Sequence, residues 1–101
     1  MYVSTREELS VPFTLEDDQS LEFVIGHVET GDTLEITIDS DHPSDTYEVT
    51  LFHERTLLLT RVKSGRTIIY RAPLSANLTI KVLCVYAPGG SGVVKVRVTR
   101  A

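Results

Sequence analysis

Apolar and polar residues alternate along most of the chain. The clearest early example runs from Leu9 to Leu15, where every second residue is apolar. Alternation of this kind is typical of a β-strand that buries one face and exposes the other. Pro12 lies inside this stretch. Because proline has no N–H to donate to a neighbouring strand, we expect this strand to lie at the edge of a sheet.

The same alternation returns at fairly even spacing through the rest of the sequence. Further apolar stretches lie at 21–25, 34–38, 47–51, 57–62, 67–70, 78–84 and 94–98. They make about eight strands separated by turn-forming residues, and no stretch has a convincing helical period. The pattern therefore predicts an all-β fold, an antiparallel β-sandwich with a jelly-roll or Greek-key topology.

The length of 101 residues fits one domain. We expect a single β-sandwich over residues 9–101, preceded by an N-terminal arm at 1–8. Since free tails are disordered unless tied down, the arm is expected to pack on its own domain or on the open sheet edge of a neighbouring copy.

The sequence shows no signal peptide and no apolar run approaching the ~20 residues of a membrane helix. We therefore expect no membrane span, and a location in the cytoplasm or in an assembled particle. The single cysteine, Cys84, excludes an intramolecular disulfide.

The acidic and basic residues divide between the two halves of the chain. Every Asp and Glu lies at or before Glu54, and every Lys and Arg except Arg6 lies at or after Arg55. One explanation is that acidic early strands pair with basic late strands. A second is that the halves form separate surfaces of opposite charge, which would attract copies head to tail. A third is a basic face for a polyanion such as nucleic acid.

Under the second explanation, specific residues form the two surfaces. The predicted basic surface comprises Lys81, Lys95, Arg97 and Arg100, and the predicted acidic surface comprises Glu22, Glu35 and Glu48. The basic set is also the candidate for a polyanion site. Nucleic acid is not the expected partner, because the acidic half repels it and no aromatic residues alternate with the cations to stack bases.

The loop from Asp39 to Asp45 is the candidate metal site. Asp39, Asp41 and Asp45 could supply the oxygen ligands that Ca²⁺ prefers. The loop lacks the glycine and the distal glutamate of a calcium-binding helix–loop–helix motif, and Asp and Ser also favour loops because they bond to nearby backbone groups. No other cofactor is expected.

No motif indicates catalysis. Cys84 falls on the apparent inner face of a strand, where an apolar environment disfavours the reactive thiolate. His27, His42 and His53 are scattered without metal-ligand spacing, and we expect them to be exposed loop residues. The chain has no nucleophile elbow, phosphate-binding loop or dinucleotide fingerprint. We therefore expect a protein that is not an enzyme.

Four stretches carry a family resemblance: GDTLEITID, DTYEVTLF, TIIYRAPLSANLTIKVLCVY and VVKVRVT. Their alternation and turns resemble the pre-peptidase C-terminal domain family, over roughly residues 20–100, and are similar to the Golgi-dynamics type of β-sandwich. The resemblance implies an accessory, non-catalytic sandwich used for binding or assembly.

Two functions follow as expectations. The first is a non-catalytic interaction module that acts by protein–protein association, with self-assembly into an oligomer, filament or shell. The alternative is an accessory module of the pre-peptidase type that binds an extracellular polymer or Ca²⁺.

Overall fold

The computed structural model describes residues 6–86 and 90–101. Within these ranges the chain forms eight strands and no helix. The strands are β1 (Arg6–Thr14), β2 (Ser20–Val28), β3 (Thr33–Ser40), β4 (Thr46–His53), β5 (Thr56–Lys63), β6 (Thr67–Arg71), β7 (Ala76–Tyr86) and β8 (Ser91–Thr99). The prediction of an all-β fold with about eight strands is confirmed.

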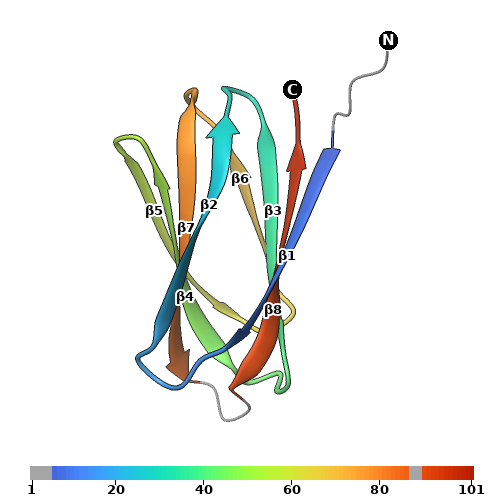
Figure 1. Ribbon diagram of the computed structural model, residues 1–101, viewed down its shortest axis with the longest axis vertical. Coiled ribbons are helices and arrows are strands. Elements are labelled where there is room, and N and C mark those ends of the chain that lie inside the picture. The colour runs from blue at the N-terminus through green and yellow to red at the C-terminus, as the bar shows by residue number, and fades with distance from the viewer. Residues whose placement is uncertain (1–5, 87–89) are drawn as a thin grey trace.

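The strands form two four-stranded sheets in which all neighbours are antiparallel. Sheet A has the order β1-β8-β3-β6, and sheet B has the order β2-β7-β4-β5 (Figure 1). The pairs β1–β8, β2–β7, β3–β6 and β4–β5 nest inside one another, as in one long hairpin rolled up into two sheets. Such nesting is typical of a jelly roll.

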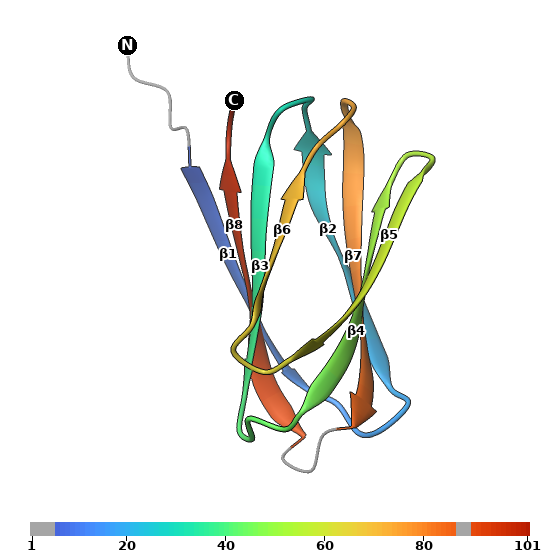
Figure 2. The same cartoon turned by 180° about the vertical axis from the view of Figure 1, so that it is seen from behind.

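Each sheet ends in two edge strands, so the sandwich has two flanks. Figure 1 looks onto the flank formed by β1 and β2, and Figure 2 looks from behind onto the flank formed by β5 and β6. We call these the β1–β2 flank and the β5–β6 flank. The prediction that the strand with Pro12 lies at an edge is confirmed, because β1 pairs only with β8.

The core lies between the two sheets and is made by the inward-facing half of each alternating strand. Ile36 of β3 and Leu51 of β4 are at most 1% exposed, as is Tyr47. The ring of Phe13 from β1 meets the ring of Tyr47 edge-on at 5.5 Å and so joins the two sheets. Each large apolar side chain buried in this way contributes about 1.5–3 kcal/mol.

The first strand begins earlier than the sequence predicted. In β1, Arg6 pairs with Thr99 of β8, and Glu8 pairs with Arg97. Residues 6–8 therefore belong to the sandwich rather than to an arm, since β8 offers them a free edge. The remainder of the predicted arm, residues 1–5, lies outside the described residues.

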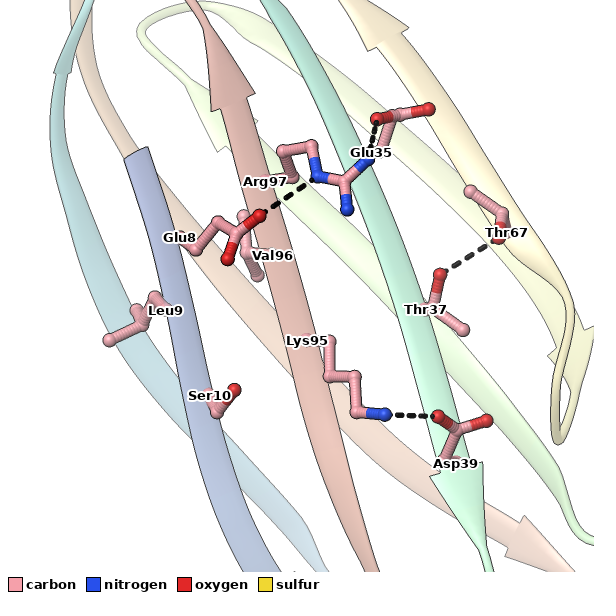
Figure 3. A pocket seen from close by; sticks show the side chains of 10 residues that line it. All are labelled: Glu8, Leu9, Ser10, Glu35, Thr37, Asp39, Thr67, Lys95, Val96 and Arg97. Carbon is pink, nitrogen blue, oxygen red and sulfur yellow. Dashed lines mark hydrogen bonds and ion pairs between the residues drawn. The ribbon is translucent and has the colours of Figure 1, made fainter. Parts of the chain in front are cut away.

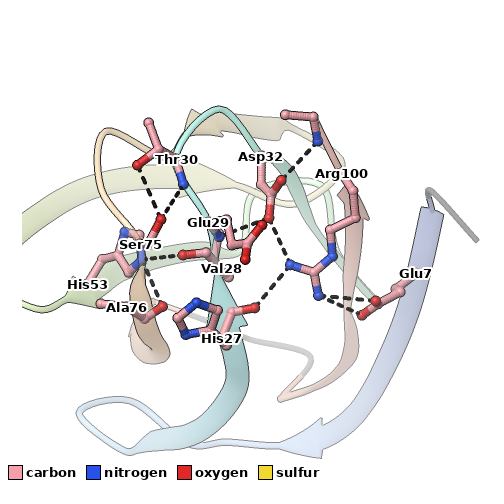
Figure 4. Close-up of polar contacts among 11 residues, drawn as sticks. Glu7, His27, Val28, Glu29, Thr30, Asp32, His53, Ser75, Ala76 and Arg100 are labelled. Carbon is pink, nitrogen blue, oxygen red and sulfur yellow. Dashed lines mark hydrogen bonds and ion pairs between the residues drawn. The ribbon is translucent and has the colours of Figure 1, made fainter.

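One histidine departs from its predicted position. His53 closes β4 in phase with Tyr47 and Leu51 and is completely buried, so the prediction of an exposed loop residue is wrong. Its Nε2 is hydrogen-bonded to the carbonyl oxygens of Val28 and Ala76 (Figure 4), and its Nδ1 to the hydroxyl of Tyr70, which makes burial possible. His27 and His42 are exposed, as predicted, but His27 lies in β2 rather than in a loop.

Candidate interaction surfaces

The outer face of sheet A carries ion pairs between early and late strands (Figure 3). Arg97 of β8 lies between two glutamates: its Nε is 3.2 Å from Glu8 Oε1, and its Nη1 is 3.6 Å from Glu35 Oε2. Lys95 Nζ is 2.8 Å from Asp39 Oδ2. The strand order of sheet A places β8 between β1 and β3, and it thereby brings basic residues beside acidic ones.

The last basic residue is held by a network at the end of β8 (Figure 4). Arg100 Nη1 donates to Asp32 Oδ2 at 2.8 Å and to the carbonyl oxygen of His27 at 3.0 Å. Its Nη2 donates to Glu7 Oε1 at 3.1 Å. The hydrogen bond to Asp32, opposed by partial burial, raises the pKa of the guanidinium. Arg100 is thus a structural cation rather than a free surface charge.

Sheet B pairs its charges in the same manner. Arg61 Nη2 of β5 is 3.3 Å from Glu48 Oε2 of β4. Lys81 of β7 lies directly opposite Glu22 of β2 in the strand register. Of the three explanations for the divided charge, pairing within one chain therefore accounts for the centre of both sheets.

The predicted basic and acidic surfaces are consequently wrong as sets. Lys95, Arg97 and Glu35 share the outer face of sheet A, whereas Lys81 and Glu48 lie on sheet B. The sequence showed which residues were charged but not that β7 and β8 would lie between early strands. Basic and acidic residues that were predicted to form separate surfaces therefore lie next to each other on the outer face of each sheet.

The two flanks of the sandwich differ in the sign of their exposed charges. The sequence has no Asp or Glu from Arg55 onward. Around β5 and β6 the exposed cations are Arg55, Arg61, Lys63, Arg66 and Arg71. The β1–β2 flank carries exposed acids. Glu7 and Glu8 are bound by Arg100 and Arg97, and Glu22 lies opposite Lys81, whereas the turn between the strands adds Glu16, Asp17 and Asp18. Among the described residues, Arg55, Lys63, Arg66 and Arg71 make no ion pair. The two flanks therefore present opposite charge.

An apolar row crosses the outer face of sheet B. The register places Val24 of β2, Thr79 of β7, Phe52 of β4 and Leu57 of β5 side by side, and Leu59 follows on β5. Val24 is 66% exposed, Phe52 40%, Leu57 63% and Leu59 57%. We call Val24, Phe52, Leu57 and Leu59 the apolar row. The alternation along the chain did not predict this row, although three consecutive leucines in a strand must place at least one on the outer face.

The three carboxylates of the predicted Ca²⁺ loop, those of Asp39, Asp41 and Asp45, do not lie together. Asp39 is bound by Lys95, Asp41 is exposed, and Asp45 is completely buried. Within 6–86 and 90–101, no three His, Cys, Asp or Glu side chains are grouped so that they could hold a metal ion. The three aspartates thus lie in different environments, and we do not assign a calcium site to them.

The remaining features give no reactive centre in the part of the chain that the structure describes. The thiol of Cys84 is buried as predicted, and burial, followed by the charge of Asp17, raises its pKa. A shallow depression of about 400 Å³ lies on sheet A, but its charged lining residues are mostly engaged with one another (Figure 3). Over the described residues, no helix is long and apolar enough to cross a membrane.

Comparison with known proteins places the fold. No family model matches the chain, and no curated protein matches it. Among solved structures, a mitogen derived from Yersinia pseudotuberculosis aligns with a TM-score of 0.63 at 12% identity, over 94% of this chain and 86% of the mitogen. A periplasmic inhibitor of g-type lysozyme from Aeromonas hydrophila aligns with a TM-score of 0.59 at 14% identity, over 94% and 85%.

A de novo designed double-stranded β-helix is also similar, with a TM-score of 0.50 at 16% identity over 92% of this chain and 96% of the design. Identities this low show a shared all-β fold and nothing more. The resemblance to pre-peptidase C-terminal domains stays a prediction, since none of these structures is described as such a domain.

Proposed function

We propose that this protein is a non-catalytic β-sandwich that acts by protein–protein association, and that its partner is another copy of itself. The apolar row on sheet B is the observation that carries the proposal. Single exposed apolar residues are normal on soluble proteins, but Phe52 and Leu57 lie directly opposite each other, and Leu59 follows on the same face of β5. Val24 extends the row to the other edge of the sheet across Thr79. Burying such a patch against a partner removes apolar surface from water.

The charge distribution favours a second copy over an unrelated protein. The β1–β2 flank is acidic and the β5–β6 flank is basic, so one molecule carries both halves of a complementary pair. The apolar row has acidic residues at one end and basic residues at the other. Protein–protein interfaces commonly have an apolar centre surrounded by a polar rim of this kind.

The native mass tests the proposal. Light scattering coupled to size exclusion, run over a concentration series, is expected to give a mass above the 11.2 kDa of one chain. The substitutions Leu57→Ser and Leu59→Ser should lower that mass, because they remove apolar side chains from the row. Tyr86→Ser is the matched control, since Tyr86 is 54% exposed but lies at the end of β7, a central strand of sheet B, away from the apolar row. A mass of one chain at every concentration would exclude self-association.

A further inference from the structure

We propose that copies associate head to tail through the edges of the sandwich, with β5 of one copy pairing antiparallel to β2 of the next. This inference rests on the proposed self-association and specifies its contact. The occupant of the β5 edge is thus a second copy of this chain, and the same contact repeats along the assembly.

The four edge strands differ in how well they are protected from pairing. Strand β6 has only five residues, and β1 contains Pro12. Strand β5 has eight residues without proline, glycine or a bulge, and it pairs on one side only. A long regular edge with unpaired backbone groups is a template for another strand. Among the edges, β5 is therefore the most available.

Strand β2 offers a regular edge that ends at a defined point. From Ser20 to Val24 it pairs regularly with β7, and a register shift follows at Gly26. Gly26 has a φ of +105°, a conformation that glycine adopts without a Cβ clash. The bulge re-aims the strand, so the segment Ser20–Val24 is the part of this edge that can accept a partner.

Charge selects which edges meet. The charged residues of β5 are Arg61 and Lys63, and the charged residue of β2 before the bulge is Glu22. Pairing of β5 with β5 of another copy brings cations together, and pairing of β2 with β2 brings acids together. Pairing of β5 with β2 is the complementary choice, and like-charge contacts oppose the alternatives.

Strand direction agrees with the same choice. In sheet B each neighbour is antiparallel, so β5 runs opposite to β2 across the four strands. A second copy placed beside β5 without being inverted therefore presents β2 in the antiparallel direction. Sheet A has the same alternation, and β6 then faces β1 of the next copy. Both sheets can continue across one contact.

The apolar row and the ion pairs set the register. Leu59 and Val24 both point outward from sheet B, so they can lie opposite each other on one continuous face. That register also places Arg61 opposite Glu22 of the next copy. Val24, Leu57 and Leu59 are more exposed than Phe52 because β2 and β5 are edge strands and lack a neighbouring strand on one side. A second copy in this register would supply that neighbour. Because the two surfaces differ, the assembly is a ring or a filament.

Engineered cysteines test this contact directly. Leu59→Cys and Val24→Cys are prepared as separate proteins, one with an affinity tag so that the possible dimers differ in mass. Opposite residues of an antiparallel pair lie about 4.5–5.5 Å apart at Cβ, within reach of a disulfide after small adjustment or of a short bis-maleimide. The native Cys84 is buried and does not compete.

The expected result is cross-linking between the Leu59→Cys and Val24→Cys proteins in a mixture, and none in either protein alone. Ile69→Cys, which is equally exposed but lies on sheet A, is the control and should cross-link with neither. Leu59→Cys joining to itself would overturn the inference in favour of a symmetric contact. A native mass above one chain without the mixed cross-link would overturn the inference while leaving self-association in place. A mass of one chain would overturn both.

Discussion

Asp32, which is 1% exposed, accepts a hydrogen bond from Arg100 at 2.8 Å. The same carboxylate accepts hydrogen bonds from the N–H groups of Glu29 and Ala101, each at 2.9 Å. It thereby joins the turn before β3 to the end of β8. Burial alone would raise the pKa of Asp32, but the hydrogen bonds from Ala101, Arg100 and Glu29 outweigh burial and lower it.

This network predicts a loss of stability in acid. Because the pKa of Asp32 is lower in the folded than in the unfolded chain, its contribution is fully present above about pH 3.9, the ordinary value, and is lost as the pH falls through the folded value. Asp32→Asn should therefore destabilise the protein at pH 7 by about 1–3 kcal/mol, with a smaller difference from wild type near pH 2. Urea denaturation at both pH values measures this.

Asp41→Asn is the matched control for Asp32, because Asp41 is exposed in a loop. It should change the free energy of unfolding by less than about 0.5 kcal/mol. Equal effects of Asp32→Asn at pH 7 and pH 2 would contradict the linkage, since the charge of Asp32 would then contribute nothing.

The buried imidazole of His53 makes a second prediction. Its Nε2 faces the carbonyl oxygens of Ala76 at 3.0 Å and Val28 at 3.2 Å, so Nε2 carries the proton and donates. In neutral His53, Nδ1 then accepts from the hydroxyl of Tyr70 at 2.9 Å. Tyr70→Phe leaves Nδ1 buried without a donor and should cost about 1–3 kcal/mol.

Chemical denaturation of Tyr70→Phe measures this cost, with Tyr86→Phe as the control. Tyr86 is 54% exposed, and its hydroxyl is expected to contribute less than about 0.5 kcal/mol. If both variants had wild-type stability, the hydrogen bond between His53 and Tyr70 would not contribute to folding.

Alternation along the sequence was enough to predict the strands and the buried face of those that alternate strictly, but not the buried face of β5, where Leu57, Leu58 and Leu59 are consecutive. Tyr47 and Cys84 are fully buried, as their phase in the pattern predicts. The alternation of β4 also places His53 on the buried face, but the polar side chain led to the wrong prediction that it is exposed. The partner that makes its burial possible is Tyr70, which lies on a later strand. Contacts between distant strands do not show in a local pattern.

The candidate surface was harder to predict for the same reason. The divided charge could be seen in the sequence, but whether Arg97 is free or bound depends on β8 lying between β1 and β3. The register alone aligns Val24 with Phe52 and Leu57, which are far apart in the sequence. Local pattern thus predicts which residues face outward, and topology decides which of them become neighbours.

The turn between β4 and β5 gives a third prediction. Glu54 has a φ of +57°, in the left-handed region that costs a residue with a Cβ about 1–2 kcal/mol. Glu54→Gly removes this strain and, after allowing for the greater backbone entropy of glycine in the unfolded chain, should stabilise the protein by up to about 1 kcal/mol. Thermal unfolding measures the gain as a higher Tm.

Asp18→Gly is the comparison for this turn. Asp18 also has a positive φ, of 68°, but aspartate tolerates the left-handed region better than glutamate because its short side chain can bond locally. The gain at Asp18 should be smaller than the gain at Glu54. A lower Tm for Glu54→Gly would show that entropy outweighs the strain.

The last prediction concerns the carboxylate of Asp45. Asp45 is completely buried, and neither of its oxygens has a hydrogen-bond partner among the described residues. A buried carboxylate without a donor is costly, whereas an amide of the same shape carries no charge to desolvate. Asp45→Asn should therefore stabilise the fold at pH 7, by about 1–3 kcal/mol. Asp41→Asn again supplies the exposed control, and urea denaturation of both variants measures the difference. A loss of stability in Asp45→Asn alone would mean that the charge of Asp45 has a favourable partner in solution.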